Sequence, residues 1–272
     1  MRTIVQLSDL HFGRVDPDLL GPLEQLVNSM RPDVLVISGD LTQRARRAEF
    51  IAARRFLDRL PMPQIVVPGN HDIPLYNVAS RFFTPLVKYR RYIERDLDPV
   101  FMDQEVAVLG INTARSLTFK DGRISAQQIA AVRKTLAGLE EQVVKVIVTH
   151  HPFDLPEHYD EGDLVGRAPQ AMAMFAECGA DLLLAGHMHA SHAGQSATRY
   201  RIGEFSAVVC QAGTATSTRG RGEMNSFNRI RIEASRIEIE QFSWVPQRAT
   251  FEAEAAEVFV RSNDRWCREA AV

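Results

Sequence analysis

The sequence predicts an α/β fold in which two β-sheets pack together and helices cover the outside. Through the first two thirds of the 272 residues, short apolar runs alternate with stretches of helical character. The apolar runs are continuous rather than alternating, which is typical of strands that are covered on both faces. Towards the C-terminus the pattern becomes mainly β. An alternating first part with a β-rich finish favours two packed sheets flanked by helices.

The individual strands and helices follow from local signatures. Strands are predicted at short apolar, mostly β-branched runs: Thr3–Leu7, Val34–Ile37, Ile65–Val67, Val106–Ile111, Val143–Val148 and Asp181–Leu184. Helices are predicted between them, at about Pro17–Met30, Arg44–Leu60, Ser125–Leu136 and Gln170–Cys178. The later strands are expected at Phe205–Gln211, Ser226–Ile232 and Arg236–Phe242. The last two of these form a hairpin through Glu233–Ser235.

Two segments depart from the alternation. Residues 73–98 are rich in arginine and aromatic residues, and they are predicted to form a small cap-like insert over a site. Basic and aromatic groups together suit a substrate phosphate attached to a base, or an anionic lipid surface. The helical spacing of Phe82, Leu86, Tyr89 and Ile93 equally suits a small packed helix with a charged outer face. Whether the insert contacts substrate therefore stays open.

The last segment is predicted as a helical tail. Val258, Phe259 and Trp266 recur at roughly helical spacing within residues 246–272, so residues 1–245 are expected to form the main domain. The apolar side chains of the tail could cross to a second subunit and form a homodimer. They could also fold back onto their own core.

Composition and charge limit the classes of function. Apolar residues make up 45% and charged residues 24%, the balance of an ordinary soluble protein. A formal net charge of -2 gives no global field for a long nucleic acid, so none is expected as a partner. No apolar run approaches the roughly 18 residues of a transmembrane helix. Asp9 and His11 come too early in the chain for a signal peptide, so a cytoplasmic location is expected.

Residue types that bind metals come directly after five of the predicted strands. The carboxyl ends of such strands are where ligand-bearing loops converge, so residues far apart in sequence can face one cleft. The glycines at positions 39, 69 and 186 fit tight turns that bring the backbone close to a bound group. The candidate metal ligands are Asp9, His11, Asp40, Asn70, His150, His187 and His189.

The mixture of ligand types indicates the kind of metal. Histidine, carboxylate and amide ligands without cysteine suit divalent ions such as Mn, Fe, Zn or Ni rather than a closed structural zinc site. Two ions about 3.5–4 Å apart would need a bridging carboxylate. Asp40 is the natural candidate for that bridge.

The order of these motifs resembles the calcineurin-like metallophosphoesterase superfamily, whose pattern is DxH, GD, GNH[DE], H and GHxH. The five motifs match in order, and the resemblance spans roughly residues 3–242. The segments Thr149–Pro152, Gly213–Ser217 and Asn225–Asn228 look similar to the bacterial class III cyclic-nucleotide phosphodiesterase branch, which also includes glycerophosphodiesterases. The resemblance implies a four-layer α-β-β-α sandwich of two mixed sheets.

The resemblance also implies a role for each ligand. Asp9, His11, Asp40 and His189 would hold one ion, and Asp40, Asn70, His150 and His187 would hold the other. A water or hydroxide between the ions would attack phosphorus in line. Together with Asn70, His71 would contact the substrate, either by hydrogen-bonding the phosphate or by protonating the leaving oxygen as a catalytic group. Asp72 could orient His71 or cap the following turn.

These observations predict a hydrolase with two divalent ions, Mn, Fe or Zn, acting on a phosphodiester in a small molecule. Cyclic nucleotides and glycerophosphodiesters are the expected substrates. The alternative enzyme is a pyrophosphatase acting on a nucleotide-linked lipid precursor. The alternative outside catalysis is a metal-free interaction scaffold, which the complete set of ligand residues disfavours.

Overall fold

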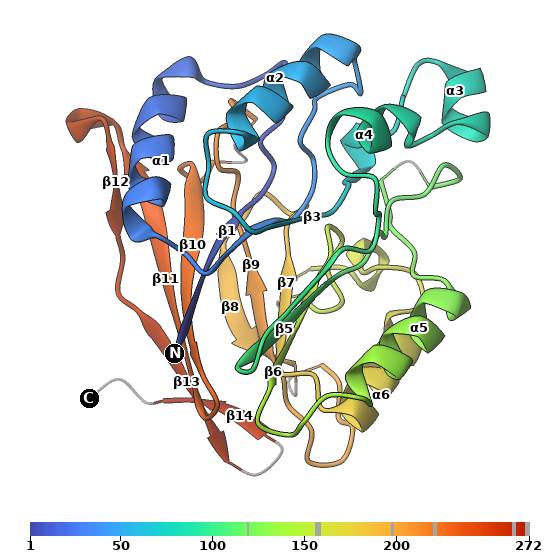
Figure 1. Ribbon diagram of the computed structural model, residues 1–272, viewed down its shortest axis with the longest axis vertical. Helices are drawn as coiled ribbons and strands as arrows, with labels where there is room; N and C mark the ends of the chain where they lie inside the picture. The colour runs from blue at the N-terminus through green and yellow to red at the C-terminus, as the bar shows by residue number, and fades with distance from the viewer. Residues whose placement is uncertain (119, 156–158, 197–198, 220–221, 263–264, 270–272) are drawn as a thin grey trace.

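The computed structural model describes residues 1–272 except 119, 156–158, 197–198, 220–221, 263–264 and 270–272, and it contains two mixed β-sheets packed face to face (Figure 1). The first sheet has the order β14-β13-β11-β10-β1-β2-β3, with β12 paired to β11. Its strands are β1 (Arg2–Leu7), β2 (Val34–Ile37), β3 (Gln64–Val66), β10 (Ser226–Glu233), β11 (Arg236–Val245), β12 (Thr250–Ala253), β13 (Glu257–Ser262) and β14 (Arg265–Arg268).

The second sheet has the order β4-β5-β6-β7-β9-β8. Its strands are β4 (Val100–Met102), β5 (Val106–Gly110), β6 (Val144–Val148), β7 (Leu182–Ala185), β8 (His192–Gln195) and β9 (Val208–Gln211). Neighbouring strands β5, β6, β7 and β9 are parallel, as are β1, β2 and β3 in the first sheet. The carboxyl ends of these parallel strands therefore lie along one edge of the sandwich.

Helices cover the outer face of each sheet. The first sheet carries α1 (Pro17–Met30) and α2 (Arg47–Leu57), and the second carries α5 (Ala126–Leu136) and α6 (Ala168–Cys178) (Figure 1). Short 3₁₀ turns η1 (Asn70–Asp72), η2 (Glu161–Asp163) and η4 (Pro246–Arg248) lie in connections. The predicted four-layer α-β-β-α sandwich is confirmed. No helix among the described residues is long and apolar enough to cross a membrane.

Strand β2 shows why the apolar runs are continuous. Its side chains point alternately to the two faces of the sheet. Val34 and Val36 lie in the core between the sheets, whereas Leu35 and Ile37 lie in the core beneath the helices. All four are fully buried. Burial of each such side chain stabilises the fold by about 1.5–3 kcal/mol, so both faces select apolar residues.

The tail does not form the predicted helix. Residues 250–253, 257–262 and 265–268 are strands, and β13 pairs with β11 so that Phe259 lies opposite Ile237. Phe259 and Trp266 are buried in the core between the sheets, and the Trp266 indole donates a hydrogen bond to Asp181 at 2.9 Å. Pairing with β11 and this burial outweigh the weak helical spacing. The tail thus folds back on its own core and joins the first sheet.

The insert contains two short helices, α3 (Val78–Phe83) and α4 (Val87–Tyr92). Leu86, Tyr89 and Ile93 are buried in the core between the first sheet and its helices. The Tyr89 hydroxyl donates a hydrogen bond to the backbone oxygen of Val66 at 2.8 Å. Phe82, predicted on the same face, is 47% exposed. The packed-helix interpretation therefore holds for α4, while α3 turns its aromatic residues outward.

Candidate metal centre

The loops after five parallel strands meet at one edge of the sandwich. Three loops come from the first sheet, after β1, β2 and β3, and two from the second, after β6 and β7. Each loop carries its candidate ligands within five residues of the strand end. The edge brings together all seven predicted residues: Asp9, His11, Asp40, Asn70, His150, His187 and His189.

Four of these residues form a first compact group. The Nε2 atom of His189 lies 3.1 Å from Asp9 Oδ1 and 3.3 Å from His11 Nε2. One ligand atom from each of Asp9, His11, Asp40 and His189 lies within 4.8 Å of the others, and all four residues are buried. Carboxylate oxygens and imidazole nitrogens that face one another at these distances form a donor set suited to a divalent cation.

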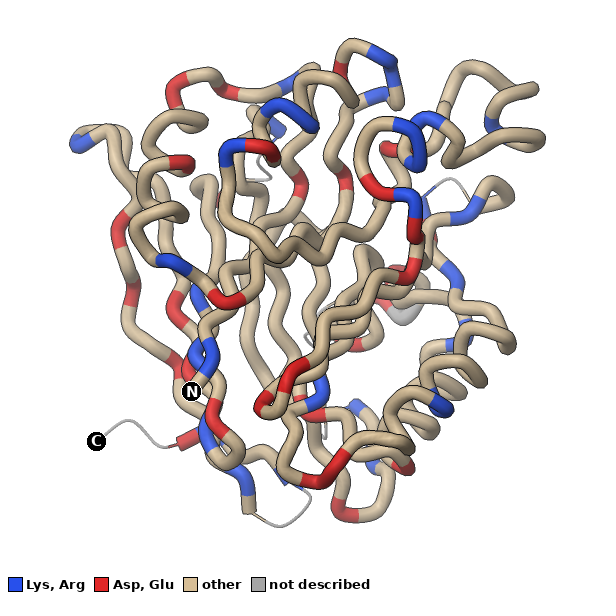
Figure 2. Tube along the Cα trace, viewed as in Figure 1, with Lys and Arg blue, Asp and Glu red and all other residues tan. Residues whose placement is uncertain are grey.

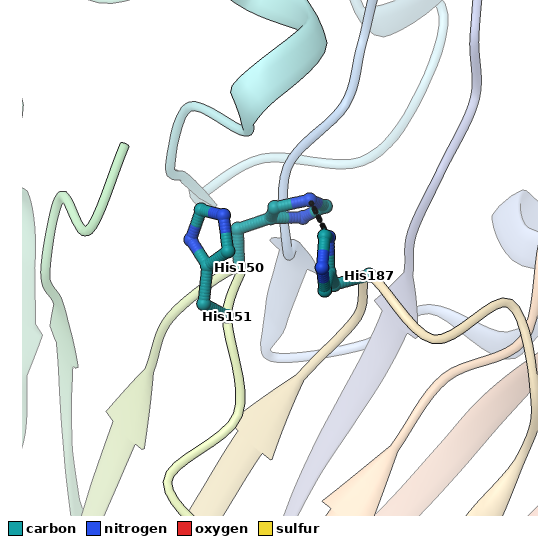
Figure 3. Close-up of side chains that lie close together, drawn as sticks. All are labelled: His150, His151 and His187. Carbon is teal, nitrogen blue, oxygen red and sulfur yellow. Dashed lines mark hydrogen bonds between the residues drawn. The ribbon is translucent and has the colours of Figure 1, made fainter. Parts of the chain in front are cut away.

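A second group lies beside the first. His150 Nε2 is 3.1 Å from Asn70 Oδ1 and 3.3 Å from His187 Nδ1. Figure 3 shows the His150 and His187 rings approaching each other from the ends of two neighbouring strands. This group supplies two imidazoles and an amide oxygen.

Asp40 lies between the two groups. Its Oδ2 atom is 3.7 Å from His11 Nε2 and 3.4 Å from His150 Nε2. Its other oxygen, Oδ1, accepts a hydrogen bond from the backbone N–H of His71 at 2.8 Å. The carboxylate is therefore held so that one oxygen is directed at both groups.

The backbone is strained at the same positions. Among the described residues, nine non-glycine residues have positive φ, and five of them are candidate ligands: Asp9, His11, Asp40, His187 and His189. Their φ angles run from 48° to 73°. Left-handed backbone at a non-glycine residue costs on the order of 1 kcal/mol and persists only where the surrounding structure imposes it. The strain is concentrated where the loops aim side chains at one point.

Glycine is required where the loops touch. A Cβ at Gly69 would lie 2.1 Å from Asp40 Oδ1, and a Cβ at Gly186 would lie 1.9 Å from the Ser8 hydroxyl. No other residue allows these backbones to approach so closely. Two of the glycines predicted to support tight turns thus set the spacing between the ligand loops.

Hydrogen bonds to backbone carbonyls orient two of the rings. His150 Nδ1 donates to the Ser38 oxygen at 2.8 Å, and His189 Nδ1 donates to the Arg219 oxygen at 3.2 Å. Each bond places the proton on Nδ1 and leaves the Nε2 lone pair directed into the centre. Such outer hydrogen bonds are the usual means of fixing a metal-binding histidine.

The electrostatics of the centre also fit a cation. Burial would raise the pKa of Asp9, but the imidazoles of His11 and His189 outweigh it and hold the pKa well below the usual range. Asp9 Oδ1 accepts no hydrogen bond of normal geometry from the described residues. Burial lowers the pKa of His187 to about 3, which leaves a neutral ring. Ionised carboxylates and neutral imidazoles are the protonation states that bind divalent ions.

His151 extends the second group without joining it. Its ring lies 4.7 Å from that of His187, centroid to centroid, but both of its nitrogens are engaged elsewhere. Nδ1 lies 2.8 Å from the Thr113 hydroxyl, and Nε2 lies 3.0 Å from the backbone oxygen of Lys120. Figure 3 shows this ring beside His150 rather than between His150 and His187. His151 thus fixes the loop that carries Lys120 against the centre.

His71 points into the pocket rather than into either ligand group. Its Nδ1 donates to the backbone oxygen of Gln43 at 2.9 Å, and its Nε2 accepts from the Arg219 guanidinium at 3.0 Å. Burial lowers the pKa of this imidazole. The Nε2 atom is therefore the one that faces the pocket.

Asp72 caps the neighbouring turns. Its buried carboxylate accepts backbone N–H groups of Leu41, Thr42 and Gly69 at 2.9–3.2 Å, and also the Thr42 hydroxyl. Burial, with the charge of Asp40 nearby, raises its pKa to about 6. Of the two roles predicted for Asp72, the contacts favour capping, because they tie the Asp40 loop to the His71 loop.

A cavity of about 280 Å³ opens over the centre and contains residues that sequence reasoning missed. Basic and polar side chains at Gln43, Arg44, Lys120 and Arg219 line it together with Asp40 and the candidate ligands. None of these four follows a strand directly or belongs to a spaced motif, so nothing in the local sequence marked them. They give the pocket three cations close to where a phosphate would bind.

Residues 2–191 match the calcineurin-like phosphoesterase family, and the chain belongs to that family. It is a metal-dependent phosphoester hydrolase. The matched region includes all seven candidate ligands and the whole of the strand edge that presents them. The predicted family is thereby confirmed.

Among named relatives, the chain is 24% identical over 210 residues to a probable glycerophosphodiester phosphodiesterase of Arcobacter nitrofigilis, covering 68% of this chain and 71% of the relative. It is 26% identical over 166 residues to a probable cyclic nucleotide phosphodiesterase of a Synechococcus species, covering 55% and 58%. A shorter match, 38% over 76 residues, is to a UDP-2,3-diacylglucosamine pyrophosphatase of Chlamydia muridarum, covering 27% and 23%.

Solved structures share the fold at low identity. A purple acid phosphatase from yellow lupin seeds superposes with a TM-score of 0.72 at 11% identity, covering all of this chain and 57% of that one. A dimetal phosphatase from Danio rerio gives 0.66 at 14% identity, covering 93% and 98%. Both support the arrangement of the two sheets and their helices.

Replacing Gly69 with alanine tests the close packing of the ligand loops. The added methyl would push Asp40 Oδ1 from its place. We expect bound metal to fall below the wild-type ratio and the free energy of unfolding to drop by about 1–3 kcal/mol. Elemental analysis and denaturant titration measure the two effects. Gly21→Ala is the matched control, because a Cβ at this helical position meets nothing within 4 Å. Normal metal content in Gly69→Ala would contradict the inferred spacing.

Proposed function

We propose that this protein is a dinuclear phosphodiesterase acting on a small-molecule phosphodiester, with cyclic nucleotides and glycerophosphodiesters as substrate classes. The observation that carries the proposal is the position of the Asp40 carboxylate between two groups of ligand atoms. One oxygen aimed at both groups is what a shared ligand of two ions requires. The names of the Arcobacter and Synechococcus relatives support diesters as the substrate class.

In this proposal Asp9, His11, Asp40 and His189 hold one ion, while Asp40, Asn70, His150 and His187 hold the other. Two divalent ions, Mn, Fe or Zn, would supply Lewis acidity and make a water molecule nucleophilic near neutral pH. The remaining tasks belong to the chain itself. Ser38 and Arg219 carbonyls keep the His150 and His189 rings in place, and Asp72 keeps the two loops of the first sheet in register.

The pocket residues would bind and orient the phosphate. The Arg219 guanidinium and His71 Nε2 lie 3.0 Å apart and face the same cavity, so both can contact one phosphoryl group. With Asn70, His71 would hydrogen-bond the phosphate or protonate the leaving oxygen, provided that its Nε2 carries a proton in place of the hydrogen bond from Arg219. Arg44 and Lys120 add positive charge at the pocket wall, which favours the negative charge that develops in the transition state.

The alternative enzyme, a pyrophosphatase acting on a nucleotide-linked lipid precursor, would use the same ligand set. The short match to the Chlamydia muridarum pyrophosphatase supports it over 27% of this chain only. A metal-free scaffold is disfavoured because no ligand position is lost and the pocket retains His71.

A panel of cyclic nucleotides, glycerophosphodiesters and nucleotide-linked lipids, assayed with Mn²⁺, tests the substrate class. Faster cleavage of the phosphoanhydride than of every diester would overturn the proposal.

Two substitutions separate metal binding from catalysis. Asp40→Asn should reduce both metal content and diester turnover, because it removes the shared negative charge. His71→Ala should lower kcat by about 10²-fold or more while both ions stay bound, because the backbone N–H that binds Asp40 remains. Metal analysis and a chromogenic diester assay give the two readouts.

The control for the first substitution is Glu141→Gln, the same carboxylate-to-amide change at an exposed site. Glu141→Gln should match wild type in both assays. A His71→Ala variant with the wild-type rate would remove His71 from the mechanism. Full metal content in Asp40→Asn would remove Asp40 as the shared ligand.

Arg219 provides a further test of the pocket. Arg219→Ala should lower kcat/KM by roughly 10²-fold, in line with removal of one preorganised donor to a transition-state oxygen. Arg219→Lys should recover only part of this loss, since a lysine cannot reproduce the guanidinium's paired donors. His189 donates its hydrogen bond to the backbone oxygen of residue 219 and not to the Arg219 side chain. Replacing that side chain should therefore leave the metal content unchanged. Steady-state kinetics at fixed Mn²⁺ decide the outcome, and unchanged kinetics would exclude Arg219 from phosphate binding.

A further inference from the structure

The insert carries an unusual concentration of exposed apolar side chains. Among the described residues twelve large hydrophobic side chains are exposed, and seven of them lie in or beside the insert. Phe83 is 86% exposed and Leu117 is 83% exposed. We refer to these seven as the insert surface: Leu75, Tyr76, Val78, Phe82, Phe83, Val87 and Leu117. Exposed apolar side chains scattered singly are common, but a cluster of this kind marks an interaction site.

A buried arginine holds the two parts of this surface together. The Arg81 side chain donates to the backbone oxygens of Ser116 and Thr118, each at 2.9 Å, and is only 2% exposed. Leu117 lies between these two anchored residues, so it is fixed beside α3. Figure 1 shows α3 projecting beyond α4 from the body of the protein. The insert surface is therefore a firm apolar projection rather than a loose loop.

Basic residues accompany the insert surface. Residues 73–98 contain five basic and three acidic residues, a net charge of +2, although the whole chain has a net charge of -2. Residues 113–123 contain three basic residues and one acidic residue. Lys88, Arg90 and Arg91 of α4 are exposed, and Figure 2 shows blue on α4, followed by alternating red and blue, beside a mostly tan α3. Apolar tips flanked by cations match an anionic lipid surface, where hydrocarbon receives the tips and headgroups pair with the cations.

A second copy of the chain is a poorer occupant. A twofold symmetric interface would place this patch against itself. With five basic and three acidic residues in the insert, each copy would bring a net charge of +2 to such an interface. Like charges brought together in this way oppose association.

The insert surface is continuous with the pocket over the metal centre. Leu75 belongs to the insert surface and also lines that pocket, together with Ile73 and His71. The Tyr76 ring packs against the Arg44 guanidinium of the pocket wall, 4.8 Å from ring centroid to guanidinium carbon. A membrane that receives α3 would therefore lie beside the mouth of the pocket.

We propose that the insert surface docks this protein onto an anionic bilayer, with the mouth of the pocket beside the headgroups. The protein binds the membrane peripherally, through the apolar side chains of α3 and Leu117 and the cations of α4. A phosphoester carried in the membrane can then reach the pocket, a consequence that rests on the proposed function. The docking itself depends only on the insert surface.

Vesicle sedimentation tests the docking with the full-length, metal-loaded protein. Vesicles of phosphatidylcholine and phosphatidylglycerol in equal parts should retain the protein at low salt, and vesicles of phosphatidylcholine alone should retain much less. A Phe83→Ser/Leu117→Ser variant should bind the anionic vesicles about tenfold more weakly, because it removes two insertion side chains. Met62→Ser/Met102→Ser is the matched control, since both methionines are exposed away from the insert. It should bind like wild type.

The charge contribution has its own variant. Lys88→Gln/Arg91→Gln should weaken binding by about fivefold per residue and flatten its salt dependence. Hydrolysis of a soluble chromogenic diester, measured in parallel, should be unchanged in every variant, because none of the altered residues lines the pocket. If the wild-type protein hydrolyses no diester, the proposed function is refuted, while the vesicle result still stands.

Three results would overturn the docking proposal. The first is wild-type protein that does not sediment with anionic vesicles at low salt. The second is a Phe83→Ser/Leu117→Ser variant that binds as tightly as wild type while circular dichroism shows the native fold. The third is light scattering that shows a wild-type dimer which this variant converts to monomer, because the insert surface would then be an interface between copies.

Discussion

The arrangement of the centre depends on two buried carboxylates, Asp9 and Asp40, that are held ionised at the meeting edge of two sheets. Burying a charge without a partner is among the most costly events in folding. The protein offsets this cost with imidazoles and a backbone N–H group at each carboxylate, and with the Ser8 hydroxyl at Asp9. A bound cation would complete the balance. The loops, their glycines and their left-handed residues can be understood as the means of holding those carboxylates in place.

The backbone strain in the ligand loops depends on the stability of the strands that carry them. Five candidate ligands adopt left-handed backbone, whereas the strands leading to them are buried on both faces. Conformational strain of this kind is sustained only by a rigid support. The two-sided burial of β1, β2, β6 and β7 provides that support within a few residues of each ligand. Rigid strands therefore allow short loops to be strained, and short strained loops allow the ligands to converge.

Sequence alone predicted most of this fold because the central strands have strong, unambiguous signals. The strand at Val34–Ile37 and the helix at Pro17–Met30 were placed with their observed bounds, since both are continuous and well bounded. The short strands β4 and β8 are not predicted, because three or four residues are too few to show a pattern, and β8 has only Ala193 as an apolar side chain. The tail was misjudged because Phe259 and Trp266 are positioned by partners elsewhere in the chain, which local spacing does not reveal.

The candidate site divides in the same way. The candidate ligands occupy ordered motifs directly after strands, so the sequence marks each of them. Lys120 and Arg219 reach the pocket from loops that only tertiary structure brings near, and Arg44, although it shares a loop with Asp40, belongs to no motif. The contacts of Asp72 illustrate a third case: its residue type was recognised, but the choice between two roles required knowledge of which backbone groups surround it.

The pairing of β1 with β10 has a consequence for how the protein is made. Arg2 lies opposite Ile232, so β1 can pair with β10 only after more than two hundred further residues have been added to the chain. Contacts of such long sequence separation form slowly, after a large loss of chain entropy. His187 and Asp9 likewise meet across most of the chain. The first half of the sequence carries the candidate ligands of the first sheet but none of the three that the second sheet provides, His150, His187 and His189. The complete set of candidate ligands therefore exists only once the chain extends past His189.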